Sequence, residues 1–163
     1  YWLNKRAPGH VVEALECLGG AGYVEETVFP RLYREAPLNS IWEGSGNVIC
    51  LDVLRAMARE PGSVEAFLGE LERARGGDRR LDAAIDGVRD ALRDGSDLEL
   101  RARRVTEQMA LALQGALLVR HAPPAVADAF CVSRLGGDHG RVYGTLPAGL
   151  DLDALVRRGA PPV

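Results

Sequence analysis

Residues 11–20 read VVEALECLGG, and their pattern indicates the fold class of the chain. Apolar residues recur here at intervals of three and four, which places them on one face of an α-helix. Gly19 and Gly20 then end the helix, as glycine does at helix C-termini. The stretch therefore predicts a helix over about residues 1–18 that ends in a glycine turn. The apolar positions are Val11, Ala14, Leu15 and Leu18.

Helical periodicity continues through the rest of the chain, and no sustained period-2 alternation predicts a strand. Pro61 and Gly62 interrupt the pattern near residue 60. We predict an all-α fold: a helical bundle over residues 1–60 and an additional C-terminal helical sub-bundle over 61–163. Residues 38–46 are expected to be a loop. Further helices are expected over about 24–35, 47–60, 63–74, 78–93, 97–120, 124–135 and 151–158. Ser63 and Asp78 are candidate N-caps of two of them.

Charge is distributed unevenly along the 163 residues, whose net charge is −3. Residues 1–52 hold 4 basic and 7 acidic side chains, whereas residues 53–163 hold 16 of each. This balance argues against a strongly basic nucleic-acid module. There is no apolar run of about 18 residues, so no transmembrane helix is expected. We expect a cytoplasmic protein.

The three cysteines, Cys17, Cys50 and Cys131, are odd in number, far apart and embedded in apolar helical patterns. Buried, reduced thiols are the expected state, and their spacing predicts no metal site. The chain lacks an initiator Met and opens directly on a helical pattern. We therefore expect it to be a fragment of a longer chain.

The turn GGAGY, residues 19–23, has three glycines in four positions between two predicted helices. Glycine lets a backbone approach a ligand closely, and the following segment can direct free N–H groups at a phosphate. A tight helix-to-helix turn is the alternative interpretation. The spacing alone does not decide between them.

The stretch LNSIWEGSGN, residues 38–47, places one acid, Glu43, between Trp42 and a glycine-rich segment. A carboxylate beside a large aromatic ring loses water, which raises its pKa and makes it a better base near neutral pH. Alternatively, Glu43 is only an acid at a helix start, where the helix dipole favours it. Ser45 or Asn47 can cap the next helix.

The order LGGAGYVEE followed by PRLYREAPLNSIWEGSGN resembles the C-terminal helical domain of the acyl-CoA dehydrogenase superfamily. Its variants, with the helix CLDVLRAMARE after them, resemble the bacterial alkylation-response, AidB-like branch. The resemblance is strongest over residues 11–60. The matching positions are Glu16, Gly19-Gly20-Ala21-Gly22-Tyr23, Tyr33-Arg34-Glu35 and Ile41-Trp42-Glu43-Gly44-Ser45.

The resemblance implies an FAD-binding protein, usually a homotetramer, whose N-terminal and middle domains are missing here or belong to a separate chain. Its glycine turn contacts the adenosine-diphosphate part of FAD, which implicates Gly19, Gly20 and Gly22. Glu16 stands where the family usually has a glutamine that reaches FAD. Ser45 and Asn47 stand where the family's Thr and Gln touch the cofactor.

The resemblance also makes Glu43 the catalytic base of an acyl-CoA dehydrogenase. It would take the α-proton of an acyl thioester while the β-hydride passes to the flavin. Trp42, where most relatives carry Tyr, would border the substrate pocket. The 163-residue chain alone is expected to be inactive, because the reaction needs the missing domains.

The AidB-like branch implies an alternative, a double-stranded DNA-binding protein of alkylation stress with little dehydrogenase activity. Arg55 matches a basic position associated with that surface, and Arg101 and Arg104 lie on one helical face that could extend it. The neutral charge of residues 53–163 weighs against this alternative, since phosphate contacts drive nonspecific affinity. A helical assembly module in which Glu43 is inert is the third hypothesis.

Overall fold

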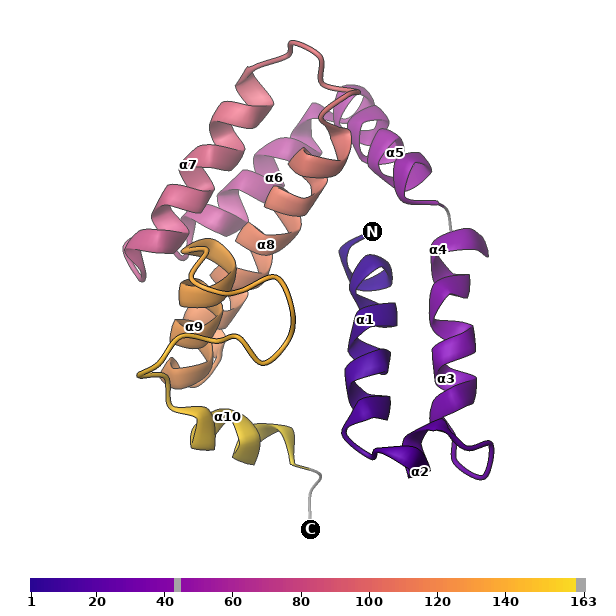
Figure 1. Ribbon diagram of the computed structural model, residues 1–163. Helices are drawn as coiled ribbons and strands as arrows, with labels where there is room; N and C mark the ends of the chain where they lie inside the picture. Colours follow the sequence, from indigo (N-terminus) through magenta and orange to yellow (C-terminus); the bar gives the residue numbers. More distant parts are fainter. Residues whose placement is uncertain (43–44, 161–163) are drawn as a thin grey trace. The chain divides into compact units, whose positions relative to one another are not determined.

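A computed structural model describes residues 1–42 and 45–160, and every regular element in them is helical (Figure 1). The predicted all-α fold is therefore confirmed. In chain order the elements are α1 (Trp2–Glu16), α2 (Gly20–Tyr23), α3 (Phe29–Glu35), the 3-10 helix η1 (Ala36–Leu38), α4 (Asn39–Trp42), α5 (Gly46–Arg59), α6 (Pro61–Glu72), α7 (Arg79–Arg93), α8 (Ala102–His121), α9 (Pro124–Phe130), the π-helix η2 (Cys131–Leu135) and α10 (Leu152–Gly159).

The chain divides into two compact units. The first contains Tyr1–Arg59 and Asp97–Glu107, and the second contains Glu60–Ser96 and the described residues from Gln108 onward. The sequence prediction drew its boundary at residue 60 and assigned everything after it to the C-terminal region. In the structure the segment Asp97–Glu107 belongs instead with the first unit.

The first unit is built on α1, which packs against α2, α3, η1 and α4. Of the largest fully buried side chains in the described chain, only Cys50 and Val105 belong to this unit. Large apolar side chains remain in water instead: Leu3 is 75% exposed and Ile41 is 70% exposed. This unit therefore lacks a core of large side chains within the described part of the chain.

The second unit has such a core, formed by one face each of α6, α7 and α8. On α7 the spacing of three and four residues directs the apolar side chains inward. Burying each large aliphatic side chain contributes about 1.5–3 kcal/mol. The predicted cap of α7 is confirmed, because the Asp78 carboxylate accepts a hydrogen bond of 2.8 Å from the Arg80 N–H. The core residues are Leu71, Ala74, Leu81, Ile85, Val88, Ala112 and Ala116.

Several predicted boundaries were wrong. The helix expected from residue 24 begins only at Phe29, with Pro30 in its first turn, where a missing N–H costs nothing. Part of the loop expected over 38–46 is helical, as α4. The helix expected from residue 97 begins at Ala102, because residues 96–101 form turns in which Asp97 adopts a left-handed φ of 48°.

Two further predictions need correction. Ser63 was a candidate helix cap, but α6 already begins at Pro61, and the Ser63 hydroxyl donates to the Glu60 carbonyl inside its first turn. Cys17 was expected to be buried, but it is exposed just beyond α1, whereas Cys50 and Cys131 are buried. The helical pattern includes Cys17, but α1 ends one residue before it.

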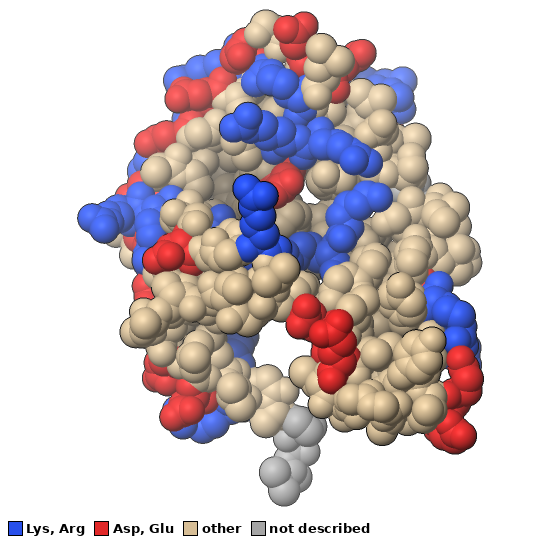
Figure 2. Space-filling model, viewed as in Figure 1, with Lys and Arg blue, Asp and Glu red and all other residues tan. Residues whose placement is uncertain are grey.

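Within residues 1–42 and 45–160, no helix combines the length and hydrophobicity needed to cross a bilayer. The same residues contain no cluster of three or more His, Cys, Asp or Glu side chains able to hold a metal ion. The face shown in Figure 2 carries both basic and acidic side chains.

Candidate functional site

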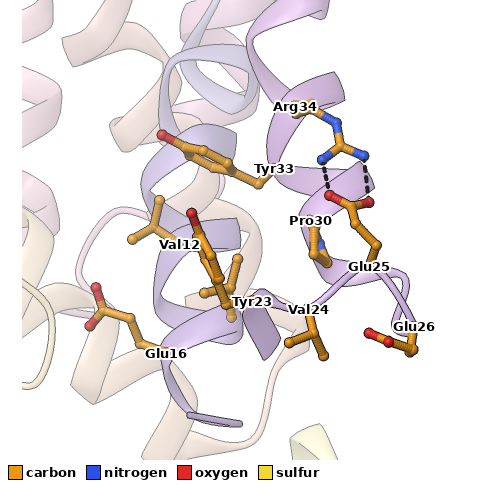
Figure 3. A pocket seen from close by; sticks show the side chains of 10 residues that line it. Val12, Glu16, Tyr23, Val24, Glu25, Glu26, Pro30, Tyr33 and Arg34 are labelled. Carbon is orange, nitrogen blue, oxygen red and sulfur yellow. Dashed lines mark hydrogen bonds and ion pairs between the residues drawn. The ribbon is translucent and has the colours of Figure 1, made fainter. Parts of the chain in front are cut away.

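A pocket of about 810 Å³ lies within the first unit, bordered by α1, α2, the segment after α2 and α3. From α1, Val12, Leu15 and Glu16 reach it at helical spacing. Figure 3 shows the Tyr23 and Tyr33 rings on the border of the same pocket, one from α2 and one from α3. Its other lining residues are Val24, Glu25, Glu26, Pro30 and Arg34.

One wall of this pocket is fixed by an ion pair between α3 and the segment that precedes it. The Arg34 guanidinium donates two hydrogen bonds to the Glu25 carboxylate, at 2.7 and 3.0 Å (Figure 3). The hydrogen bond from Arg34 holds the pKa of Glu25 below its usual value. Two parallel bonds of this kind define the direction of both side chains.

The polar lining of the pocket is mainly acidic. Glu16, Glu25 and Glu26 supply three carboxylates, against the single guanidinium of Arg34, which Glu25 already engages. A phosphate group would therefore meet like charge in this pocket. Its apolar residues and two tyrosines suit an uncharged group with hydrogen-bonding edges better than an anion.

The glycines of the turn next to this pocket lie in different surroundings. Gly19 has a φ of 56°, and a Cβ at Gly19 or Gly20 would meet no atom within 4 Å. Both are exposed, so their backbone is open to close approach. Gly22 is buried, and a Cβ there would lie 2.1 Å from the Leu15 carbonyl oxygen. Packing of α2 against α1 therefore already explains glycine at position 22.

Trp42 ends α4 and is 67% exposed. Its indole N–H donates to the Asn39 side chain at 3.0 Å. The predicted base, Glu43, follows it and lies outside the described residues, as does Gly44. Beyond them, Ser45 precedes α5, and its carbonyl accepts from the Ile49 N–H at 3.0 Å.

Asn47 lies in the first turn of α5 and is exposed, as is Ser45. Gly46 between them is buried, and a Cβ there would collide with the Arg103 and Lys5 side chains. The two predicted cofactor-contacting side chains are therefore available at the surface of the first unit, on either side of a buried glycine covered by the ends of the Arg103 and Lys5 side chains.

The predicted DNA-contacting arginines occupy different surroundings. Arg55 on α5 pairs with Asp52 at 2.8 Å and borders a groove that also contains Glu99. Arg101 lies before α8, and its N–H donates to the Asp97 carbonyl at 3.1 Å. Arg104 is exposed in the first turn of α8. The carboxylates beside Arg55 oppose an approaching phosphate.

The sequence interpretation assigned no role to Tyr23, Glu25, Tyr33 or Arg34 beyond their place in the motifs. The structure brings all four to one pocket with Glu16. A signal was present, because Pro30, Tyr33 and Arg34 are three and four residues apart and so share one face of a helix. The segment between α2 and α3 carried no comparable pattern.

The residues present fit FAD in one respect and not in another. The exposed backbone at Gly19 and Gly20 leaves room for a pyrophosphate to approach, while the Gly19 N–H itself is used within the turn, where it donates to the Glu16 carbonyl at 2.9 Å. Glu16 offers a carboxylate where an amide would donate and accept, so it cannot donate to the cofactor when ionised. The glycine turn, rather than the acidic pocket, is thus the part of this site compatible with phosphate groups.

Residues 1–58 match the family described as Acyl-CoA dehydrogenase, C-terminal domain. The chain belongs to the acyl-CoA dehydrogenase superfamily, and these residues correspond to that helical domain. Among particular proteins, it is 44% identical over 129 residues to AidB of Escherichia coli (strain K12). The aligned region covers 79% of this chain and 24% of AidB. The predicted AidB-like resemblance is confirmed.

A second relative is Acyl-CoA dehydrogenase family member 11 of Caenorhabditis elegans, 33% identical over 74% of this chain and 23% of that protein. The crystal structure of Caenorhabditis elegans ACDH-11 in complex with C11-CoA superposes with a TM-score of 0.64 and 30% identity, covering 81% of this chain and 27% of that one. The chain spans about a quarter of the length of the curated relatives that it matches.

Proposed function

We propose that the chain is the C-terminal helical part of an FAD-dependent, acyl-CoA dehydrogenase-like protein that oxidises an acyl thioester between its α and β carbons. The observation that carries this proposal is the exposed apolar surface of the unit that contains the family domain. Leu3, Ile41 and Val48 are 75%, 70% and 60% exposed. Many large apolar side chains of this unit are thus left in water, which supports their burial against other protein.

The partners in this proposal are the N-terminal and middle domains, carried by a longer chain or by a separate polypeptide. Burial of apolar area against them stabilises the first unit, by about 25 cal/mol for each Å² removed from water. Further copies of the same protein complete a homotetramer. An acyl-CoA is the proposed substrate, since ACDH-11 was crystallised with C11-CoA.

Four residues of this chain would hold the cofactor. The backbone at Gly19 and Gly20 is open to its phosphates, and the Ser45 and Asn47 side chains are exposed and able to hydrogen-bond to it. When bound, FAD accepts the hydride that leaves the β-carbon. Glu16 replaces an amide with a carboxylate, which weakens binding of an electron-rich partner at that position.

Glu43 would act as the general base that removes the α-proton of the thioester. A thioester α-proton is weakly acidic, so the carboxylate must be positioned and shielded from water. Trp42 precedes it in sequence and is 67% exposed in this chain. The shielding must therefore come from the partner domains, and the chain alone is expected to be inactive.

The first experiment is to purify the protein from its source through a tag on this chain and to record its intact mass and its flavin absorption spectrum. A longer or associated polypeptide that carries flavin supports the proposal. A 17.6 kDa species that folds and functions without either contradicts it.

In the flavin-containing protein, Glu43→Gln is then compared with the control variant Glu35→Gln. In the unaltered chain the Glu35 carboxylate pairs with Arg31 on α3. We expect Glu43→Gln to retain flavin and to slow anaerobic flavin reduction by acyl-CoA about 100-fold or more, the usual contribution of a general base. Reduction at the unaltered rate in Glu43→Gln would remove Glu43 from this role.

No observation in the described residues specifically favours the DNA-binding alternative, which stays a prediction. If it holds, duplex DNA affinity falls steeply with salt, with a slope set by the number of phosphates contacted. Changing Arg101 or Arg104 to Gln would then reduce the slope of log affinity against log salt concentration by about 1 for each residue, because each change removes one phosphate contact. An affinity that does not respond to these changes excludes the predicted surface.

A further inference from the structure

A second cavity, of about 550 Å³, lies wholly within the second unit, between α7, α8 and the end of η2. Its volume falls in the range of about 300–1,000 Å³ that is typical of small-molecule sites. Most of its lining is apolar or small, from three elements that also build the core of this unit. These residues are Ala83, Ala84 and Gly87 of α7, Gln108 and Leu111 of α8, and Leu135 and Gly136 at the end of η2.

The charged side chains of this cavity all have one sign. Arg79, Arg80 and Arg134 line it, and none of its ten described lining residues is acidic. Elsewhere in the unit arginines meet carboxylates directly: Arg75 and Arg89 both bond to Glu72 at 2.8 Å. Arg80 is held by carboxylates in the same way, so the positive charge of the cavity is attributed to Arg79.

No stabilising ion pair among the described residues explains the presence of arginine at position 79. Arg80 beside it is held by Asp78 and by Asp128, the latter at 2.7 Å. Arg79 has no carboxylate partner within residues 1–42 and 45–160 and lies in the first turn of α7. A positive charge at a helix N-terminus is unfavourable toward the helix dipole. An anion in the cavity would remove this unfavourable interaction.

The backbone of η2, which contributes lining residues to the cavity, is also unusual. η2 is a π-helical turn over Cys131–Leu135, closed by a hydrogen bond of 2.7 Å from the Gly136 N–H to the Cys131 carbonyl. Such turns are rare and occur often at functional sites. This turn carries Arg134 and Leu135, so one charged and one apolar lining residue come from it together.

Gly87 keeps the cavity open in the middle of α7. Glycine inside a helix is less favourable than alanine by about 0.5–1 kcal/mol. Packing does not require it here, because a Cβ at position 87 would meet no atom within 4 Å. Gly69 in α6 has equally open space but does not line the cavity, and it therefore provides a matched control.

We propose that this cavity binds a small amphiphilic anion. Arg79 and Arg134 engage its carboxylate or phosphate headgroup, and its apolar chain lies over Ala83, Ala84, Gly87 and Leu111. Arginine suits both headgroups because its planar guanidinium donates two parallel hydrogen bonds to either. The site lies outside the first unit, so its occupation does not depend on flavin or on Glu43.

The test is isothermal titration calorimetry of the whole chain with decanoate, decyl phosphate, decanol and inorganic phosphate. Decanoate or decyl phosphate should bind at least about tenfold more tightly than either decanol or inorganic phosphate, because only they satisfy both parts of the site. The tighter of the two identifies the headgroup. Equal affinity for inorganic phosphate and decyl phosphate would overturn the proposal, as would equal affinity for decanol and decanoate.

Two pairs of variants locate the binding. Gly87→Leu fills the cavity and should weaken binding about tenfold or more, whereas Gly69→Leu should not. Arg79→Gln should weaken binding about tenfold, whereas Arg73→Gln, which removes a partner of Glu70 outside the cavity, should not. Circular dichroism confirms that each variant folds. Unchanged affinity in folded Gly87→Leu, or equal losses in both leucine variants, would overturn the assignment.

Discussion

Arg34 and Glu25, nine residues apart in sequence, are joined by two parallel hydrogen bonds that close one wall of the first unit's pocket. Both side chains are more than half exposed, so the pair contributes little to global stability. Its consequence is local. The segment between α2 and α3 contains no regular element, and this pair fastens it to α3.

We therefore expect Arg34→Gln to raise the pKa of Glu25 toward its ordinary value of 4.5 and to loosen the segment around it. In the folded protein that pKa is lowered, so the attachment is complete above pH 4.5 and is lost as the pH falls through the folded value. Carboxyl titration by NMR and hydrogen exchange of residues 24–28 measure both effects.

Arg31→Gln is the matched control, because Arg31 pairs with Glu35 on the same helix at 3.0 Å and does not contact Glu25. It should leave the Glu25 titration and the exchange of that segment unchanged. If Arg31→Gln and Arg34→Gln had the same effect, the attachment would depend on the charge of α3 rather than on the specific pair.

The variants Gly22→Ala and Gly20→Ala should differ in stability, because packing requires glycine at position 22 but not at position 20. An alanine Cβ at position 22 would collide with the Leu15 carbonyl at 2.1 Å, whereas at position 20 it would meet nothing within 4 Å. We expect Gly22→Ala to lower the free energy of unfolding by about 1–3 kcal/mol. Gly20→Ala should change it by about 0.5 kcal/mol or less. Urea denaturation gives both values, and similar losses in the two variants would contradict this division.

Much of the fold could be predicted because apolar spacing and helix-stop residues act locally. α1 ends at Glu16, two residues before the predicted end at about residue 18, and Asp78 caps α7 as its position predicts. The start of α8 could not be predicted in this way. Asp97 takes a positive φ, an uncommon conformation that aspartate can adopt but that its identity does not require.

Less of the candidate site could be predicted. A pocket depends on how separate segments pack against one another, and the apolar periodicity within each segment does not predict that packing. The motifs indicated Glu16, Gly19 and Gly20, but not that Glu25 would meet Arg34 beside them. The cavity of the second unit gave no motif at all. Its arginines, Arg79 and Arg80 of α7 and Arg134 of η2, are 54 to 55 residues apart, and only the folded chain brings them together.

Thiol reactivity should distinguish the three cysteines. Cys17 is exposed, whereas Cys50 and Cys131 are fully buried. Burial raises the pKa of Cys131 to about 11, so its reactive thiolate is scarce at neutral pH. Maleimide labelling followed by mass spectrometry should add one group to the native chain and three to the denatured chain. Native Cys17→Ser should take up none, and labelling of that variant before unfolding would show that a buried thiol is accessible.

Asp78 should contribute most of its stabilisation through its position at the start of α7. Its carboxylate accepts from the Arg80 backbone at 2.8 Å and from the Arg80 side chain, and the side-chain bond is the main cause of its lowered pKa. We expect Asp78→Ala to lower the free energy of unfolding by about 0.5–2 kcal/mol, the usual cost of losing such a cap.

The pH dependence of Asp78→Ala and a control variant test the same contact. Because the folded pKa lies below the ordinary value of 3.8, the wild-type advantage over Asp78→Ala should be complete above pH 3.8 and shrink as the pH falls through the folded value. Asp128→Asn removes the other partner of Arg80 but leaves the cap in place, so it should cost less at neutral pH. Equal losses in the two variants would mean that the ion pairs of Arg80, and not the cap, stabilise the start of α7.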